Sequence, residues 1–189
     1  MMNFKGYMKV MDFSKIKSLC LEKGKLVEIK KKDYFVRQGE LSKYVGFIES
    51  GIFRYIRIGS DGDEHIISYS FQDDFVCDYS SVIRMSHSHI NLQAVTDCKI
   101  YSLSVQDLND FWETNMDTQR LGRLAAEELF IAMYKRLLDF YCDTPEQRYI
   151  ALLQRCPDLP QYITLKEIAS FLDVTPETVS HIRRKLLNK

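Results

Sequence analysis

Residues 165–184 read LKEIASFLDVTPETVSHIRR, a pattern typical of two short helices joined by a tight turn. Apolar residues recur at three- and four-residue steps in both segments: Ile168, Ala169 and Leu172 in the first, then Val179, Ile182 and Leu186 in the second. Two such faces pack against each other, and Val174 between them is placed to fill the small core. The stretch therefore predicts a helix-turn-helix, an arrangement that binds DNA in many proteins.

The turn and the start of the second helix carry signals of their own. Thr175 is a favoured N-cap, and Pro176 follows at the first helical position, where a missing N–H costs no hydrogen bond. Asp173 stands after the first helix, at a position that such turns place at positive φ, which Asp tolerates less readily than Gly but better than most residues. We expect the second helix to begin at Pro176.

The second helix turns its polar face outward, as a recognition helix in a major groove does. Glu177 can accept a hydrogen bond from a cytosine amino group, and His181 can reach a purine edge. The residues predicted to contact bases or phosphates are Thr175, Pro176, Glu177, Thr178, Ser180, His181, Arg183, Arg184 and Lys185. The competing interpretation is an ordinary helical hairpin with a solvated basic end.

The composition is that of a globular protein: of 189 residues, 46% are hydrophobic and 28% charged, and the 26 basic residues balance the 26 acidic ones. Because the formal net charge is zero, overall charge does not favour a nucleic-acid partner, and that inference depends on the local pattern. No apolar run approaches the about 18 residues that a membrane span needs, and the N-terminus lacks the apolar core of a secretion signal. We expect a cytoplasmic protein that does not bind membranes.

The sequence offers little to catalysis or metal binding. Its five cysteines form no C-x-x-C pair, which argues against a disulfide framework and against a zinc or iron–sulfur site. No nucleophile–base pair, metal triad or Gly-rich phosphate loop is present, and the acidic segment 60–64 (SDGDE) is typical of a hairpin turn. We expect no enzyme activity, no metal and no cofactor.

The N-terminal half alternates between apolar and polar residues in short runs that turn signals separate, which predicts strands. After a short helix at 13–21, the expected strands lie at 34–36, 45–48, 52–58, 65–71, 92–95 and 99–103. This pattern indicates an antiparallel β-roll, a double-stranded β-helix or jelly-roll-like arrangement, and the fold class is α+β with helices after the roll.

Helical periodicity begins after Ser104, an expected N-cap, and continues through Phe140. Two apolar lines run along residues 117–141: Leu121, Leu124, Ile131 and Leu138 form one, and Ala126, Phe130, Met133, Leu137 and Phe140 the other. We expect one line to lie on the β-roll and the other to meet the same helix of a second subunit, with Glu128 and Lys135 interrupting a heptad-like seam. The alternative is an internal helix in a monomer.

These boundaries divide the chain into three parts. Residues 1–103 form the expected β-roll sensor domain, 104–142 a helical connector with the dimerisation helix, and 143–189 the DNA-binding domain. Asp143, Thr144 and Pro145 break the long helix and open a shorter one at 146–153, so the hinge between the last two parts is expected to be short.

This order of parts resembles the Crp–Fnr family of bacterial transcription regulators over nearly the whole chain. Gln38-Gly39-Glu40 and the segment 47–51 are similar to the family's strand-turn signature, and 163–169 with 175–182 to its DNA-binding segment. The resemblance implies a cyclic-nucleotide-binding-like domain, a homodimer bound to inverted-repeat double-stranded DNA, a (winged) helix-turn-helix and RNA polymerase as a partner. It places the base-reading positions at Pro176, Glu177 and His181, of which only Glu177 keeps the usual residue type.

The sensor domain departs from the cyclic-nucleotide-binding members of that family. There, a Gly-Glu-Leu segment contacts the ribose and a later Arg-Ser or Arg-Thr pair binds the cyclic phosphate, whereas the matching stretches here are 75–79 (FVCDY) and Ser88-His89. A buried phosphate without a fixed cation is poorly compensated. Because of this departure from the family's pattern, we expect that the domain does not bind cyclic nucleotide. The candidates for a pocket that binds another effector, or none, are Cys77, Asp78, Tyr79, Arg84, Ser88 and His89.

A second hypothesis is a small-ligand or haem sensor whose C-terminal module acts mainly through protein contacts. His87 and His89, with Cys77 upstream, supply imidazole and thiolate, the chemistry that haem iron accepts. Alternating histidines in a polar loop are more typical of a protein surface.

From the helix-turn-helix and the family resemblance, we expect the protein to be a homodimeric, sequence-specific transcription regulator.

Overall fold

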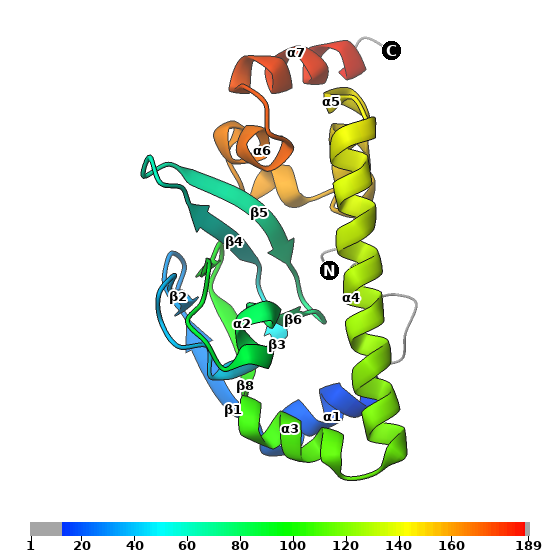
Figure 1. Ribbon diagram of the computed structural model, residues 1–189. Helices are drawn as coiled ribbons and strands as arrows, with labels where there is room; N and C mark the ends of the chain where they lie inside the picture. Colours follow the sequence, from blue (N-terminus) through cyan, green and yellow to red (C-terminus); the bar gives the residue numbers. More distant parts are fainter. Residues whose placement is uncertain (1–12, 188–189) are drawn as a thin grey trace.

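The computed structural model describes residues 13–187 and has two sheets, a long helix and a C-terminal group of short helices (Figure 1). The strands are β1 (Lys25–Ile29), β2 (Tyr34–Val36), β3 (Tyr44–Ser50), β4 (Phe53–Ile58), β5 (Glu64–Ser70), β6 (Phe75–Val76), β7 (Asn91–Ala94) and β8 (Cys98–Ser104). The helices are α1 (Ser14–Lys23), α2 (Tyr79–Arg84), α3 (Val105–Glu113), α4 (Met116–Cys142), α5 (Pro145–Arg155), the 3-10 helix η1 (Leu159–Gln161), α6 (Leu165–Leu172) and α7 (Pro176–Leu187).

The strands form two four-stranded antiparallel sheets, in the orders β1-β8-β3-β6 and β2-β7-β4-β5. Between them lies a core of fully buried apolar side chains that includes Ile48, Phe53, Leu92 and Ile100. At the corner between β3 and β4, Gly51 has a φ of 105°, and a Cβ there would lie 2.5 Å from the Cys98 sulfur. The predicted α+β class with an antiparallel β-roll is confirmed.

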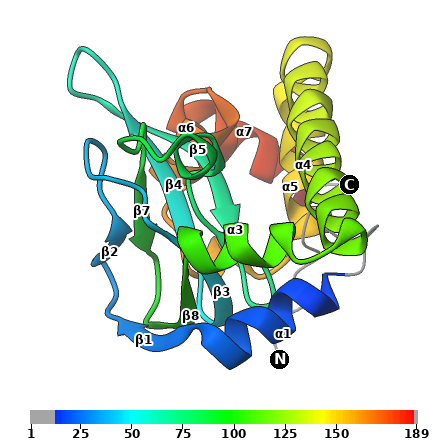
Figure 2. The same ribbon diagram turned by 60° about the horizontal axis from the view of Figure 1, so that its bottom comes forward.

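Helices close one end of the roll, where α1 and α3 lie against β8 (Figure 2). Ile16 and Leu19 of α1 share a buried cluster with Val45 and Phe47 of β3 and with Leu108 of α3. The helix predicted at 13–21 is thus present, and its last residue is Lys23.

The helical periodicity predicted from Ser104 to Phe140 is interrupted. Ser104 does cap α3, because its hydroxyl accepts the N–H of Asp107 at 3.0 Å, but α3 ends at Glu113. Asn115 then starts α4 with a capping box: its side chain accepts the N–H of Thr118, and the Thr118 hydroxyl accepts the N–H of Asn115. This reciprocal pair begins α4, and Thr114 and Asn115 separate it from α3.

α4 stands beside the roll as a column, and its first turns contact α3 (Figure 1). Leu121 packs with Trp112 at the roll, but further along Ile131 is 56% exposed and Phe130 68% exposed. The expectation that one apolar line would lie on the β-roll is therefore wrong for most of the helix. Beyond Glu128 the apolar side chains of both lines are exposed.

Candidate DNA-binding interface

The two helices of the predicted motif begin and end where the sequence places them. Asp173 follows α6 with φ 53° and ψ 55°, the left-handed conformation that the turn requires. The Thr175 hydroxyl accepts the N–H of Thr178 at 3.3 Å, and α7 begins at Pro176. These local predictions are confirmed.

The apolar faces of α6 and α7 pack together on α5. Each helix contributes buried side chains to one cluster: Ile168, Ala169 and Leu172 from α6, Val179 and Ile182 from α7, and Tyr149 and Leu152 from α5, with Cys156 just after it. Arg148 of α5 fixes the end of this unit, because its guanidinium donates to the carbonyl of Leu172 at 2.9 Å and to that of Asp143 at 2.8 Å. The orientation of α7 is thus fixed by its inner face.

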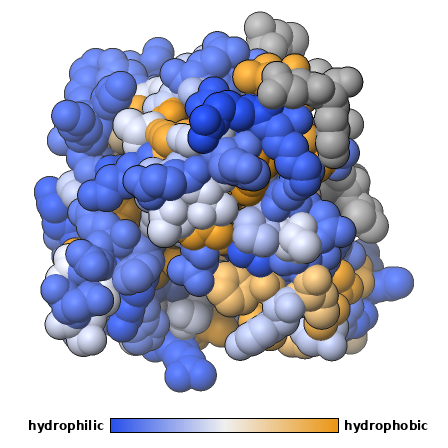
Figure 3. Space-filling model, turned by 90° about the horizontal axis from the view of Figure 1, so that it is seen from above, coloured by the Kyte–Doolittle hydropathy of each residue, from blue (hydrophilic) through white to orange (hydrophobic). Residues whose placement is uncertain are grey.

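The outer face of α7 carries the residues predicted to contact DNA. Six of them are exposed, namely Thr175, Glu177, His181, Arg183, Arg184 and Lys185, and Pro176, Thr178 and Ser180 are half-buried. Lys185 forms an ion pair with Glu146 of α5, so this lysine supports the helix packing as well as adding charge. Seen from above, the end of the molecule that carries α7 is mostly hydrophilic (Figure 3).

The predicted dimer residues follow α4 with heptad spacing. Leu121, Leu124 and Glu128 are half-buried near the start, whereas Ile131 and Leu138 are exposed further along. Lys135 interrupts the seam as expected and is paired with Asp139 at 2.7 Å. The C-terminal half of α4 thus exposes a large apolar surface.

In the β-roll, two of the predicted pocket residues, Ser88 and His89, donate hydrogen bonds to a third, Asp78. Only 7% of Asp78 is exposed, and its carboxylate accepts hydrogen bonds from the hydroxyls of Ser81 (2.7 Å), Ser80 (3.0 Å) and Ser88 (3.1 Å) and from the N–H of His89 (2.8 Å). Burial alone would raise the pKa of this carboxyl, but the four hydrogen bonds outweigh burial and hold its pKa below the usual range. The carboxylate is therefore a buried anion whose charge is stabilised by four hydrogen bonds from the protein.

The other pocket candidates do not join this cluster through their side chains. Burial raises the pKa of the Cys77 thiol to about 12, so the thiol stays protonated, and burial also raises the pKa of Tyr79. Arg84 lies in the last turn of α2, where its side chain is exposed. The imidazole of His89 is exposed too, and only its backbone N–H reaches Asp78.

Sequence reasoning missed Ser80 and Ser81, which supply two of the four donors. They belong to α2, a six-residue helix that the sequence analysis did not predict. The one available signal was the run Asp78-Tyr79-Ser80-Ser81, in which an acidic residue precedes hydroxyl side chains in the manner of a helix start.

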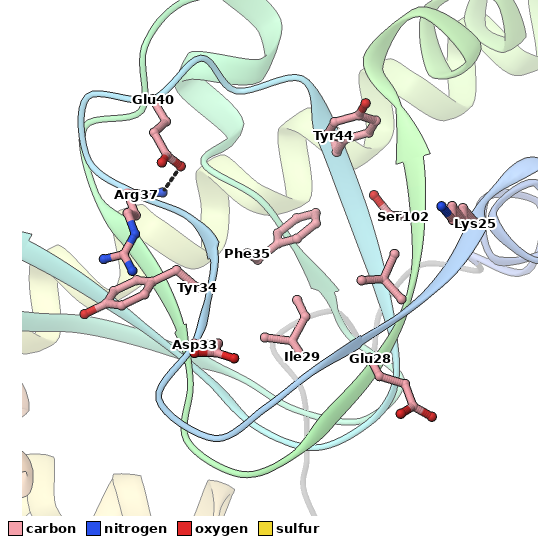
Figure 4. Close-up of a pocket in the computed structure, with 11 residues that line it drawn as sticks. Lys25, Glu28, Ile29, Asp33, Tyr34, Phe35, Arg37, Glu40, Tyr44 and Ser102 are labelled. Carbon is pink, nitrogen blue, oxygen red and sulfur yellow. Dashed lines mark hydrogen bonds between the residues drawn. The ribbon is translucent and has the colours of Figure 1, made fainter.

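A cavity of about 640 Å³ lies elsewhere in the roll (Figure 4). Phe35 and Ile29 point into it, and Arg37 stacks 3.8 Å from the centre of the Tyr34 ring at its edge. None of the predicted pocket residues lines this cavity. The Asp78 cluster and the cavity are therefore separate features of the sensor domain.

Among residues 13–187, no group of three or more His, Cys, Asp or Glu side chains is arranged to hold a metal ion. No helix in the described part of the chain is long and apolar enough to cross a bilayer.

Comparisons with known proteins agree with this architecture. Residues 26–115 match the model of the cyclic nucleotide-binding domain. Among curated proteins, no sequence relative of the chain is found.

Several solved structures are similar to this chain over most of its length. FixK2 from Bradyrhizobium japonicum has a TM-score of 0.73 at 18% identity, covering 87% of this chain and 85% of its own. A putative Crp/Fnr-family transcriptional regulator from Eubacterium rectale gives 0.66 at 14% identity, covering 97% and 88%. The catabolite activator protein of Thermus thermophilus gives 0.55 at 18%, covering 96% and 86%. Residues 26–115 thus resemble the cyclic nucleotide-binding domain, and the chain has the same fold as these solved structures, which include a putative Crp/Fnr-family regulator.

Proposed function

We propose that this protein is a homodimeric, sequence-specific DNA-binding transcription regulator whose β-roll does not respond to cyclic nucleotide. The observation that carries the proposal is the outer face of α7, where Glu177, His181 and Arg184 are all exposed on a helix whose inner face is buried. A helix fixed in this way can enter a major groove without rearranging its own core.

The bases and the phosphates are contacted by different residues in this proposal. Glu177 and His181 lie in the first two turns of α7 and read base edges, whereas Arg183 and Arg184 lie further along and bind phosphate. Residues 143–189 act as the DNA-binding domain, 104–142 as the connector and 1–103 as the sensor.

Dimerisation is supported by the exposed surface of α4. Ile131 and Leu138 are one heptad apart, so they lie on the same face, and both are more than two-fifths exposed in the isolated chain. A parallel copy of α4 would cover them. Two recognition helices related by a two-fold axis read an inverted repeat with half-sites about one helical turn apart.

The lack of a cyclic-nucleotide response is supported by Asp78. The resemblance aligns Ser88 and His89 with the pair that binds the cyclic phosphate, and here the Ser88 hydroxyl and the His89 N–H both donate to the Asp78 carboxylate. A phosphate at this place would meet a buried negative charge in place of a cation. RNA polymerase as a partner is an expectation from the resemblance, which names no effector.

Selection of bound fragments from random duplexes, followed by affinity measurements on variants, tests the proposal. We expect Glu177→Ala and His181→Ala to relax base preference, and Arg184→Ala to weaken binding to all sequences and reduce the salt dependence by about one phosphate contact. Cyclic nucleotide at millimolar concentration is expected to leave the melting temperature unchanged. An equal loss of affinity in all three variants, or no selected sequence, would contradict the proposal.

A further inference from the structure

The first helix of the motif, α6, uses a second face to contact the β-roll. Glu167, Ser170 and Phe171 stand three and four residues apart, so they share one side of α6, adjacent to the side that packs on α7. The β5 strand, at the edge of its sheet, lies against this side (Figure 1). The helix-turn-helix is therefore held by more than its link to α4.

An ion pair between the two units forms the polar part of this contact. The guanidinium of Arg54 on β4 pairs with the Glu167 carboxylate, and only about one fifth of each side chain is exposed (20% and 19%). Arg54 is itself held by the Gln93 amide oxygen, which accepts from its Nε at 2.9 Å. Glu167 is held by the N–H of Thr164, which donates to its second carboxylate oxygen at 2.7 Å. Both partners are thus positioned before they meet.

Ser170 closes the exposed edge of the sheet. Its hydroxyl oxygen accepts the backbone N–H of Ile66 in β5 at 3.0 Å. Because β5 is an edge strand, this N–H has no neighbouring strand to receive it, and α6 supplies the missing acceptor.

Phe171 completes the contact and joins a third element. Its ring lies 5.6 Å from that of Tyr69 in β5, a side chain only 2% exposed, and the guanidinium of Arg136 in α4 stands 4.2 Å from its centre. The roll, the dimer-helix candidate and the helix-turn-helix therefore meet at one residue.

We propose that Arg54, Glu167, Ser170 and Phe171 form a clamp that fixes the orientation of α7 relative to the β-roll, and that Arg54 is a positioning residue for DNA binding. All of these contacts fall on α6 and none on the outward residues of α7, so the clamped arrangement leaves the predicted DNA-contacting face free. Buried apolar side chains of the roll, among them Ile52 and Phe71, also share a cluster with α5, α6 and α7, so the clamp acts together with this apolar contact. The two-residue link Asp143–Thr144 and the bonds of Arg148 add to it.

The inference rests on the proposed function, and its consequence differs from a general loss of folding. A dimer engages a full inverted repeat only when both recognition helices have the correct orientation at once, whereas a single half-site requires one. When only a tenth of the molecules hold the competent orientation, apparent affinity falls about tenfold. Release of the clamp therefore weakens binding to the full repeat more than binding to one half-site.

The experiment compares the full-length protein with Arg54→Ala and with Arg57→Ala as a matched control. Arg57 lies on the same strand, but its guanidinium donates to the carbonyl of His89 within the roll. Affinity is measured by fluorescence anisotropy for the selected inverted repeat and for a duplex that keeps one half-site. Hydrogen exchange at the Ile66 amide reports the clamp without DNA.

We expect Arg54→Ala to exchange faster at Ile66, to bind the full repeat about tenfold more weakly, and to bind the half-site within about twofold of the parent. Arg57→Ala is expected to match the parent in all three. Tighter binding by Arg54→Ala, an equal loss on both duplexes, or unchanged exchange at Ile66 would each overturn the clamp. If the parent protein selects no DNA, the proposed function fails while the exchange at Ile66 still tests the contact.

Discussion

Replacement of Asp78 tests whether a buried carboxylate organises the sensor domain. In Asp78→Ala the four donors lose their common acceptor, but they do not lose equally. The Ser81 hydroxyl has an alternative acceptor in the carbonyl of His87 at 3.1 Å, and the Ser88 hydroxyl has one in the carbonyl of Ile90 at 2.8 Å. The backbone N–H of His89 has no second acceptor among the described residues, so it bears most of the loss.

The size of the effect follows from this difference. Hydrogen bonds to a charged group contribute about 1.5–3 kcal/mol, and a buried donor left unsatisfied costs about 1–3 kcal/mol. Because two hydroxyls find other acceptors, we expect Asp78→Ala to lower the free energy of unfolding by about 3 kcal/mol in total. Asp78→Asn keeps an oxygen for the His89 N–H, so it should cost only about 1 kcal/mol. For a chain of this size these values correspond to about 6–12 °C and about 2–4 °C in melting temperature.

The assay is urea denaturation followed by tryptophan fluorescence and circular dichroism, with Asp33→Ala as the control because Asp33 is exposed. The pKa of Asp78 is lowered in the folded state, so its carboxylate stabilises the fold above the unfolded pKa of about 3.9 and loses this effect as the pH falls through the folded pKa. The difference between parent and Asp78→Asn should be constant above about pH 5 and shrink below about pH 4. If Asp78→Ala is no less stable than Asp33→Ala, the reasoning is refuted.

Three further changes test the helices. Leu138→Asp places a charge on the exposed face of α4 and should convert the dimer to a monomer in sedimentation equilibrium, whereas Arg123→Ala, at an exposed ion pair, should not. Asp173→Val should be about 1–2 kcal/mol less stable to urea than Asp173→Gly, because φ there is 53°; equal stability would contradict the left-handed turn. Asn115→Ala removes the cap of α4 and should cost about 1 kcal/mol in thermal unfolding, a loss that Asn115→Ser should largely avoid.

The sequence predicted best where the physical cause is local. Thr175 and Ser104 cap the helices expected of them, and Asp173 has the positive φ that its place after α6 requires. In each case the interaction joins residues within three or four positions of each other, so both partners can be identified from the sequence alone. The β-roll was predicted for a similar reason, because period-two alternation is a property of each strand alone.

Predictions were weaker where a polar signal competed with an apolar period. The single helical stretch predicted from Ser104 to Phe140 missed the break at Thr114–Asn115, although Asn115 and Thr118 have the spacing of a capping box and only Met116 is apolar between Trp112 and Leu121. The six-residue helix α2 was likewise not predicted. Asp78 precedes this helix, and its carboxylate accepts hydrogen bonds from Ser81 and from Ser88 and His89 further along the chain. No local pattern in the sequence indicates the last two bonds.

The contact between α6 and the roll shows why the relation of the parts was beyond sequence reasoning. Glu167 has the spacing of a capping box with Thr164, and the structure contains that box, so the residue is already explained by local structure alone. Its second partner, Arg54, is 113 residues away. One carboxylate thus begins the first helix of the motif with one oxygen and ties that helix to the sensor sheet with the other. A change at Arg54 therefore acts on the DNA-binding unit without removing its cap, which makes it a cleaner probe of orientation than any change at Glu167.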